Sequence, residues 1–218
     1  MAGSDGSQGT IKPTITAIIP AYDEEETIGE VVSRTLRHVD EVIVVDDGST
    51  DDTSPLAEEA GAEVIRNVVN VGKRRSLLRG YRAAHGDIVV SLDADLQHDP
   101  DDIPRLIEPI LSDQADLVIG VRAQLPYFSE RFIAGLTSLR VGVKDASSGY
   151  RAIRRNVVDR MEIHGSCTCG TFILEARSRG ARIAEVPIEV AERRTGARRI
   201  QTKHFMHTLW VLYDLIRY

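Results

Sequence analysis

The sequence predicts a single α/β domain that is Rossmann-like, with a mainly parallel central sheet and an amphipathic helix at the C-terminal end. Strand and helix signals alternate through the first 120 residues, and repeated β-α units of this kind build a parallel sheet with helices on both faces. The chain has 218 residues, of which 42% are hydrophobic, so its length and apolar content suit one domain with a substantial core.

The individual elements follow from apolar periodicity and from residues that end helices and strands. Runs of β-branched residues predict strands, and apolar residues at helical spacing predict helices. Pro20 stops the first strand, Gly61 ends the second helix and Gly86 closes the third. The predicted strands cover residues 15–19, 42–45, 63–66, 88–92 and 117–121, and the predicted helices cover residues 24–39, 53–60, 76–84 and 101–112.

The pattern changes after residue 122. Residues 123–150 are less periodic and too long for a plain connection, so we expect either a lid or a helical excursion over the site. Residues 183–190 predict a strand, and Pro187 within it favours an edge strand or a bulge. Residues 204–218 predict an amphipathic helix that faces a membrane, or else packs on its own core or on a partner. The predicted division is a disordered leader at residues 1–13, a domain at 14–200 and the amphipathic helix segment at 201–218.

Charge is distributed unevenly along the chain, whose net charge is −6. Residues 93–102 hold five acids, and residues 73–82 and 193–203 each hold five bases and no acid. The negative net charge argues against general nucleic-acid binding, whereas basic stretches facing an acidic one suit a metal with a nucleotide diphosphate. The alternative for each basic stretch is a solvated helix or loop face.

Other features limit the class of protein. Cys167 and Cys169 are too few for a four-ligand zinc site or a disulfide framework, so we interpret them as ordinary thiols in a reducing compartment. No stretch reaches the roughly 18 apolar residues of a membrane span, and residues 1–10 lack the apolar core of a secretory signal.

The most informative motif follows the strand that begins at Ile88. This apolar run stops at Asp93-Ala94-Asp95, and open α/β sheets bind ligands at the carboxyl ends of their strands. Two hard oxygen ligands there suit Mg²⁺ or Mn²⁺, and such ions commonly bridge the phosphates of a nucleotide. A plain polar turn after the strand is the alternative.

Two other strand ends are expected beside this motif. Tyr22 follows the first strand and is suited to flank a base. Asp47 follows the second strand and can accept hydrogen bonds from a base N–H or a ribose hydroxyl. Because the carboxyl ends of parallel strands meet at one edge of a sheet, the three motifs together predict a nucleotide site.

These motifs resemble family 2 glycosyltransferases of the GT-A fold, and more closely the polyprenyl-phosphate glycosyltransferases of the dolichol-phosphate mannose synthase type. The resemblance rests on residues 19–25, 44–51 and 93–100, and Ser148-Gly149-Tyr150-Arg151 and Glu185-Val186-Pro187-Ile188 support it. It covers about residues 14–200. The resemblance implies the GT-A fold and a nucleotide-sugar donor.

The resemblance also implies roles for the matching residues. The nucleotide would be bound by Pro20, Tyr22, Glu24, Val45, Asp47, Lys73 and Ala94. The divalent cation, Mg²⁺ or Mn²⁺, would be held by Asp93, Asp95 and Gln97. The acceptor phosphate and the donor diphosphate would be contacted by Arg122, Arg131, Arg193 and Arg199, and catalysis would depend on Asp93, Asp95 and Arg122. The chain departs from the family at Gly72-Lys73-Arg74, where Gly-Lys-Gly is common, and at Arg198-Arg199, where Ser-Lys is usual.

We therefore expect a metal-dependent, inverting transfer of a hexose to a polyprenyl or dolichyl phosphate at the cytoplasmic face of a membrane. Mannose from GDP-mannose is favoured over glucose from UDP-glucose. A lipid phosphate is anionic near neutral pH and needs no general base. The Glu-Asp and Gln-x-x-Arg-Trp strings of hydroxyl-acceptor and processive members are absent. Peripheral membrane contact or a separate membrane subunit would bring the enzyme to its lipid.

Two other functions remain open from the sequence. A soluble family 2 enzyme with a small hydroxyl acceptor would need a carboxylate base, for which Asp145 is the candidate. Asp145 otherwise orients the acceptor loop or acts as a structural cap. A non-catalytic nucleotide-binding or receiver-like module is the alternative from another class. His98 and His164 are expected to be loop or surface residues and not ligands.

Overall fold

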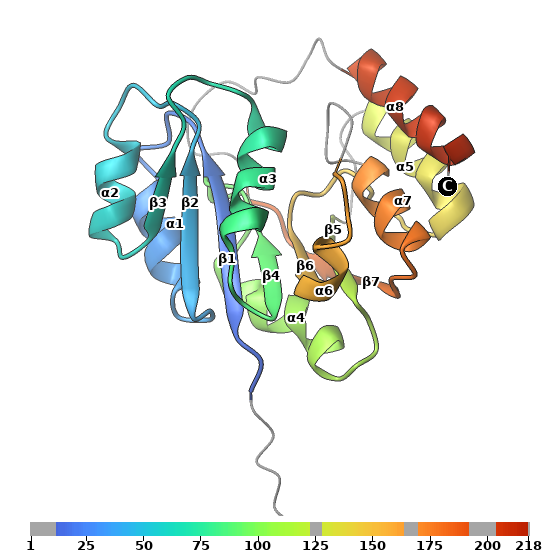
Figure 1. Cartoon of the computed structure of the whole chain (residues 1–218), viewed down its shortest axis with the longest axis horizontal. Helices are drawn as coiled ribbons and strands as arrows, with labels where there is room; N and C mark the ends of the chain where they lie inside the picture. Colours follow the sequence, from blue (N-terminus) through green and yellow to red (C-terminus); the bar gives the residue numbers. More distant parts are fainter. Residues whose placement is uncertain (1–11, 123–127, 164–169, 192–203, 218) are drawn as a thin grey trace, which may run out of the picture.

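The computed structural model describes residues 12–122, 128–163, 170–191 and 204–217. Its centre is a seven-stranded sheet with the order β3-β2-β1-β4-β6-β5-β7 (Figure 1). Neighbouring strands run parallel, except that β6 is antiparallel to both β4 and β5. The strands are β1 Ile15–Ala21, β2 Glu41–Asp46, β3 Glu63–Arg66, β4 Ile88–Ser91, β5 Leu117–Arg122, β6 Arg151–Arg154 and β7 Ile183–Ile188.

Helices cover both faces of the sheet. The helices are α1 Ile28–Thr35, α2 Thr53–Glu59, α3 Lys73–Ala83, η1 Pro100–Asp102, α4 Ile103–Leu111, α5 Phe128–Val141, α6 Arg155–Val158, α7 Gly170–Ser178 and α8 His204–Arg217. Buried side chains of α1, α2 and α4 pack on one face, and those of α3, α6 and α7 pack on the other. Side chains alternate between the faces along β1, where Ala17 and Ile19 join the first cluster and Ile18 joins the second.

The predicted α/β class is confirmed, while several boundaries move. α1 is shorter than the predicted helix at residues 24–39, because residues 24–27 form a turn before it. β1 continues past Pro20 to Ala21. Alternate residues of a parallel strand face opposite neighbours, and Pro20 faces the β4 side, where pairing has already ended at Ile18 and Ser91. Its missing N–H therefore costs no ladder hydrogen bond.

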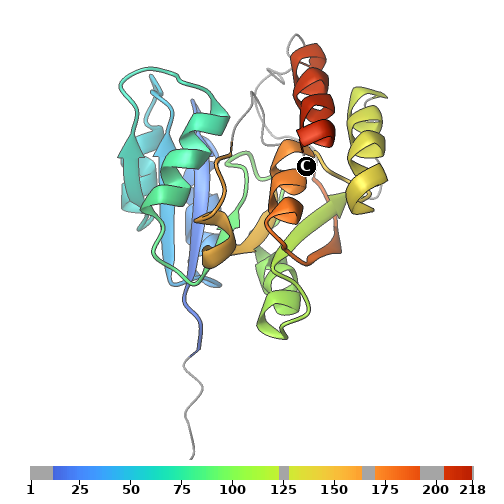
Figure 2. The ribbon, with the colours of Figure 1, turned by 45° about the vertical axis from the view of Figure 1, so that its right-hand side comes forward.

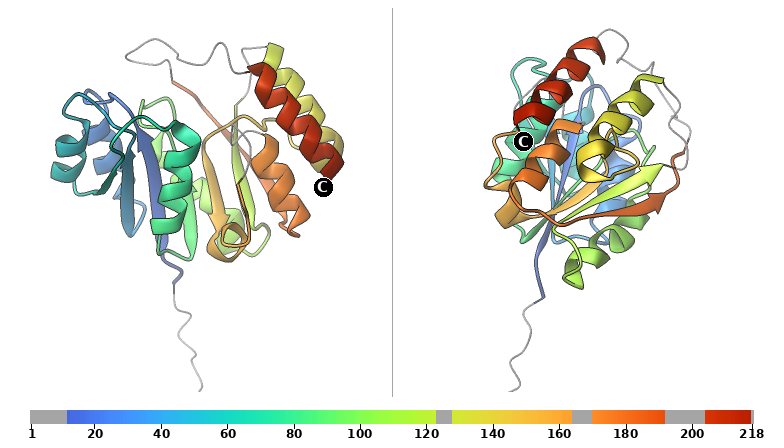
Figure 3. Two further views of the ribbon diagram at one scale, coloured as in Figure 1. Left: turned by 45° about the horizontal axis from the view of Figure 1, so that its top comes forward. Right: turned by 90° about the vertical axis from the view of Figure 1, so that its right-hand side faces the viewer.

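Part of the region after β5 forms the helix α5, so of the two alternatives, a lid or a helical excursion, the structure shows a helix there. α5 packs against α7 and α8, and Figures 1 and 2 show these three helices gathered beside the β5–β7 end of the sheet. α8 runs alongside α5 in both views of Figure 3. β7 is an edge strand, which confirms the prediction drawn from Pro187.

The antiparallel strand β6 and the helix α7 are absent from the sequence-based prediction. β6 has only four residues and begins with Arg151, whose side chain is buried and lies over the ring of Phe172 of α7, 4.9 Å from its centroid. A charged residue at a buried strand position hides the apolar pattern that identifies a strand. The cation–π contact that makes this burial tolerable joins residues far apart in sequence.

Candidate active site

The predicted strand ends meet at one edge of the sheet. β1, β2 and β4 are neighbours, and all three end at the upper edge in Figure 1. The loop after β1 is tied to the loop after β2: the backbone N–H of Asp23 donates to Ser49 Oγ (3.0 Å), and that of Glu24 donates to Thr53 Oγ1 (2.8 Å). Tyr22 and Glu24 are held half-buried at this edge.

The two adjacent aspartates after β2 have different surroundings. Asp46 is fully buried and accepts hydrogen bonds from Ser49 N (2.8 Å) and from the hydroxyls of Ser49 and Ser54. Burial would raise the pKa of Asp46, but these hydrogen bonds and the charge of Arg66 hold its pKa below the ordinary value. Asp46 is therefore a structural carboxylate that shapes the loop.

Asp47 holds the next loop. Its Oδ1 accepts from Asn67 Nδ2 and Val71 N, both at 2.9 Å, and its Oδ2 accepts from Gly72 N at 2.8 Å. Gly72 has a φ of +92°, which glycine adopts without strain, and α3 begins at the next residue. Asp47 therefore fixes the approach to α3, and further hydrogen bonds to a nucleoside would add to these three.

In the acidic motif after β4, the first aspartate is paired with a lysine side chain. Lys73, the first residue of α3, forms an ion pair with Asp93 through its Nζ. Gly149 borders the pair, since a Cβ at this residue would lie 3.2 Å from both Lys73 Nζ and Asp93 Oδ1. Asp95 is 7% exposed, and its Oδ1 accepts from the backbone N–H of Gln97 (3.1 Å). The sequence-predicted residues Lys73 and Asp93 are thus brought together from separate elements.

The donor set suits a hard divalent cation. Asp93 and Asp95 offer carboxylate oxygens, and the ammonium of Lys73 shows that Asp93 is placed to hold a positive charge. Within the described ranges, no three His, Cys, Asp or Glu side chains are grouped so as to hold a metal by themselves. A cation here would complete its coordination with phosphate oxygens and water, as Mg²⁺ commonly does.

Arg122, at the end of β5, is paired with Asp145. Arg122 Nε donates to Asp145 Oδ2 (2.7 Å), and its Nη2 donates to Asp145 Oδ1 (3.1 Å) and to Ser147 Oγ (2.6 Å). Asp145 is fully buried. Burial would raise the pKa of Asp145, but Arg122 and the hydrogen bonds from Ser147 hold its pKa below the ordinary value. A buried, ion-paired carboxylate with a lowered pKa is a poor general base.

His98 lies behind the acidic motif and not at the surface. It is 6% exposed, and its ring stacks on Tyr150 with centroids 5.1 Å apart. Tyr150 is itself buried, and its hydroxyl donates to the carbonyl of Asp99 (2.9 Å). Burial lowers the pKa of His98. The expectation of a loop residue is right, but the surface alternative is wrong, because the ring packs the loop after Asp95 on Tyr150, the residue before β6.

Some predicted residues are placed differently from their expected roles, and others lie outside the described part of the chain. Val45 is fully buried and packs under α3, so only its backbone faces the strand end. Pro20 is half-buried and Ala94 is 3% exposed. Arg131 belongs to α5, but its side chain is outside the description. The residues of which the structure describes nothing include His164, Cys167, Cys169, Arg193 and Arg199.

Sequence reasoning missed the residues that support the site. Asn67 and Ser147 each bond a predicted site residue, Asp47 and Arg122 respectively. Gly149 leaves room for the Lys73 ion pair. The Ser- and Gly-rich run at residues 147–149 was the available signal for Ser147 and Gly149, whereas nothing local marked Asn67.

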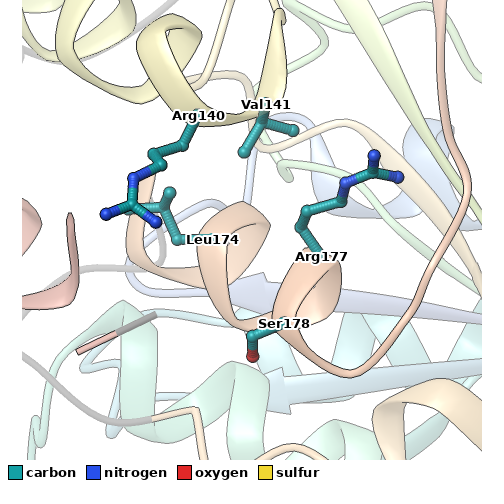
Figure 4. A pocket seen from close by; sticks show the side chains of 5 residues that line it. All are labelled: Arg140, Val141, Leu174, Arg177 and Ser178. Atoms are coloured by element: carbon teal, nitrogen blue, oxygen red, sulfur yellow. The ribbon is translucent and has the colours of Figure 1, made fainter. Parts of the chain in front are cut away.

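A separate cavity lies away from this edge, between the C-terminal ends of α5 and α7. It has a volume of about 150 Å³ and is lined by Arg140, Val141, Leu174, Arg177 and Ser178. The guanidinium groups of Arg140 and Arg177 point away from one another (Figure 4), and Arg140 Nη2 donates to the carbonyl of Leu215 (3.0 Å). The two cations do not converge on a common ligand position.

An open α/β sheet with carboxylates at the carboxyl ends of neighbouring strands is typical of nucleotide-dependent α/β enzymes. Residues 16–174 match the family described as glycosyl transferase family 2. This chain belongs to that family. The sequence-predicted family is thereby confirmed.

Relatives within the family indicate the range of its substrates. The chain is 30% identical to a dolichol-phosphate mannosyltransferase of Pyrococcus furiosus, over 94% of this chain and 64% of the relative. It is 33% identical to an undecaprenyl-phosphate 4-deoxy-4-formamido-L-arabinose transferase of Pseudomonas fluorescens, over 93% of this chain and 64% of the relative. The chain thus spans just under two thirds of the length of these curated relatives.

Solved structures confirm the GT-A fold. Glucosyl-3-phosphoglycerate synthase of Mycobacterium tuberculosis in complex with Mn²⁺ and UDP-glucose superposes with a TM-score of 0.80 at 27% identity, covering 93% of this chain and 79% of that one. Its complex with phosphoglyceric acid also gives 0.80 at 27% identity, covering 93% and 80%. The proteins to which this chain is similar therefore include transferases named for a polyprenyl phosphate and a synthase that binds phosphoglyceric acid.

Proposed function

We propose that this chain transfers a hexose, with inversion, from a nucleoside diphosphate sugar to a polyprenyl phosphate. The observation that carries the proposal is the meeting of Asp47, Lys73 and Asp93 at the shared edge of β1, β2 and β4. Open α/β sheets bind ligands at this edge, and Asp47 would suit the nucleoside, Lys73 the diphosphate and Asp93 a divalent cation. Residues 14–200 would form the catalytic domain.

The donor would lie across this edge. Tyr22, Glu24 and Asp47 would bind the nucleoside, and Asp93, Asp95 and Gln97 would hold Mg²⁺ or Mn²⁺. When bound, the divalent ion would neutralise the charge that develops on the departing nucleoside diphosphate. Mannose is the favoured sugar because a dolichol-phosphate mannosyltransferase is among the relatives; the UDP-glucose complex of a solved relative makes glucose the donor to test beside it.

The acceptor would enter from the side of Arg122. Its guanidinium, oriented by Asp145, would contact the acceptor phosphate, with Arg131, Arg193 and Arg199 as further contacts. A phosphate oxygen is already anionic and can attack the anomeric carbon directly in one in-line displacement, which inverts its configuration. This fits the state of Asp145, which is buried against Arg122 and unsuited to abstract a proton.

A small phosphorylated acceptor is the second candidate. The solved relative binds phosphoglyceric acid, and such an acceptor would present a phosphate to the same arginine. Its hydroxyl would need a general base other than Asp145. The two candidates therefore share phosphate recognition and differ in the attacking atom.

A lipid acceptor implies contact with a membrane. No helix in the described ranges is long and apolar enough to cross one. α8 buries Val211 against α7, which agrees with packing on its own core, while Leu212, Tyr213 and Ile216 remain exposed, the last at 87%. Such side chains suit the interfacial region of a bilayer. We propose that the enzyme works at the cytoplasmic face, through peripheral contact or a membrane subunit.

The deciding experiment measures transfer of radiolabelled sugar. GDP-mannose and UDP-glucose are each offered with a short polyprenyl phosphate or with 3-phosphoglycerate, in Mg²⁺, in Mn²⁺ and in EDTA. We expect organic-extractable product from one donor that EDTA abolishes, and a loss of turnover in Asp95→Asn but not in Asp159→Asn, a distant surface control. Label that enters only 3-phosphoglycerate would favour the second candidate. Lipid product that persists in EDTA and in Asp95→Asn would refute the metal site.

A further inference from the structure

One short segment contacts both carboxylates that the proposed site assigns to ligands. The backbone N–H groups of Val71 and Gly72 donate to Asp47 at 2.9 and 2.8 Å, and the side chain of Lys73 pairs with Asp93. These three consecutive residues span from the nucleoside end of the site to the metal end. The side chain of Lys73 can therefore move away from Asp93 while the backbone before it stays fixed by Asp47.

The ion pair between Lys73 and Asp93 is one that a metal ion can replace. Lys73 is 46% exposed and Asp93 is 28% exposed, so solvent reaches both partners. Exposed ion pairs contribute less than about 1 kcal/mol, whereas a divalent cation bonds directly to carboxylate oxygen. Gly149 confines the pair on one side. A metal ion and the ammonium would compete for the same oxygen.

Lysine is suited to such an exchange. Its ammonium is a compact charge with three donors on a flexible four-carbon stem, so it can leave one oxygen for another without movement of the helix. A diphosphate coordinated to the metal would bring phosphate oxygens within the reach of that stem. Charge-assisted hydrogen bonds to phosphate are stronger than the exposed ion pair they would replace.

We propose that Lys73 is a positioning residue that holds Asp93 in the absence of ligand and transfers its ammonium to the donor diphosphate when the divalent cation and the nucleotide bind. The inference rests on the metal site of the proposed function. Its consequence is that the free cation binds weakly, in competition with Lys73, whereas the cation and the nucleotide strengthen each other's binding.

The test is Mn²⁺ binding, followed by the electron paramagnetic resonance signal of the free ion, with and without a nucleoside diphosphate. We compare the wild type with Lys73→Met, which keeps an unbranched side chain that is one atom shorter and removes the charge. Arg82→Met is the matched control, because Arg82 is an exposed cation at the other end of α3. Thermal unfolding by circular dichroism checks that each variant is folded, and Lys73→Gln provides a second neutral variant.

The affinities for Mn²⁺ and for the nucleotide should change in opposite directions in the Lys73 variants. Without nucleotide, both Lys73 variants should bind Mn²⁺ about three- to fivefold more tightly, the factor that an exposed ion pair represents. With Mn²⁺ present, they should bind UDP or GDP about tenfold more weakly, because a charged hydrogen bond to phosphate is lost. Arg82→Met should change neither affinity by as much as twofold, since its charge is screened.

Three results would overturn the exchange. Nucleotide-free Mn²⁺ affinity that stays the same or falls in the Lys73 variants would show that the lysine does not compete with the metal. An equal loss of nucleotide affinity in Arg82→Met would show that the effect comes from the change in net charge and not from the position of Lys73. An absence of Mn²⁺ binding in every variant, even with nucleotide, would refute the metal site as well. If the Mn²⁺ and nucleotide affinities shift in opposite directions but the transfer assay yields no lipid product, the exchange is supported and only the polyprenyl acceptor is rejected.

Discussion

Replacement of Asp145 by asparagine should destabilise the fold by about 3 kcal/mol, because it removes the buried carboxylate that pairs with Arg122. Asp145 accepts five hydrogen bonds, at 2.7, 3.1 and 3.5 Å from Arg122 and at 3.0 and 2.8 Å from Ser147. Breaking a buried ion pair costs about 3–5 kcal/mol. The side chain of Arg122 keeps 15% exposure, which favours the lower end of this range.

Urea unfolding at pH 7 measures this loss, and a thermal scan should show a fall in Tm of about 6–12 °C for a chain of this size. A double-mutant cycle with Arg122→Met isolates the pair, and its coupling energy should exceed about 1 kcal/mol. Asp159→Asn is the matched control, because Asp159 pairs with Arg155 at the surface and is 55% exposed. A coupling energy near zero, or equal losses in Asp145→Asn and the control, would refute the reasoning.

The pH dependence gives the same prediction an independent check. The pKa of Asp145 is lower in the folded state than in the unfolded chain, because Arg122 and Ser147 outweigh the effect of burial. Its contribution is therefore complete above the ordinary aspartate pKa and is lost as the pH falls through the folded value. The gap in unfolding free energy between wild type and Asp145→Asn should be constant from about pH 7 to 5 and should narrow only below about pH 4.

Two further changes test other parts of the structure. Gly149→Ala should weaken metal-dependent nucleotide binding about threefold or more while changing the free energy of unfolding by less than about 0.5 kcal/mol. The added Cβ would lie 3.2 Å from Asp93 and shift a metal ligand whose geometry is strict. Calorimetric titration measures the affinity, and Gly135→Ala, whose Cβ would have no atom near it, should leave the affinity unchanged. Asp116→Asn should lower the free energy of unfolding by about 1 kcal/mol at pH 7, since hydrogen bonds from Arg182 hold the pKa of Asp116 at about 2 in a screened pair. The difference in urea unfolding should narrow as the pH falls below about 4 and should be lost as the pH falls through about 2; a difference that keeps its neutral-pH size there would contradict the assignment.

The strand ends that carry the chemistry could be predicted from the sequence. Asp93 and Asp47 each follow an apolar, β-branched run, and such runs become buried strands in almost any α/β context. Parallel β-α units place consecutive strand ends at one edge, so local pattern and a general topological rule were sufficient to predict that these strand ends meet and that the fold is α/β. The edge position of β7 followed in the same way from Pro187, which lacks the N–H that an inner strand needs.

The partners of these residues depended on tertiary structure. Lys73 meets Asp93 across 20 residues of chain, and Arg122 meets Asp145 across 23. Whether Asp145 is a base or an anchor could not be read from its neighbours in sequence, because its protonation depends on burial and on Arg122, which ends the strand β5. Local patterns report how a segment buries its apolar face. The pairing of charges depends on which segments the sheet brings together, and that is settled only when the chain packs.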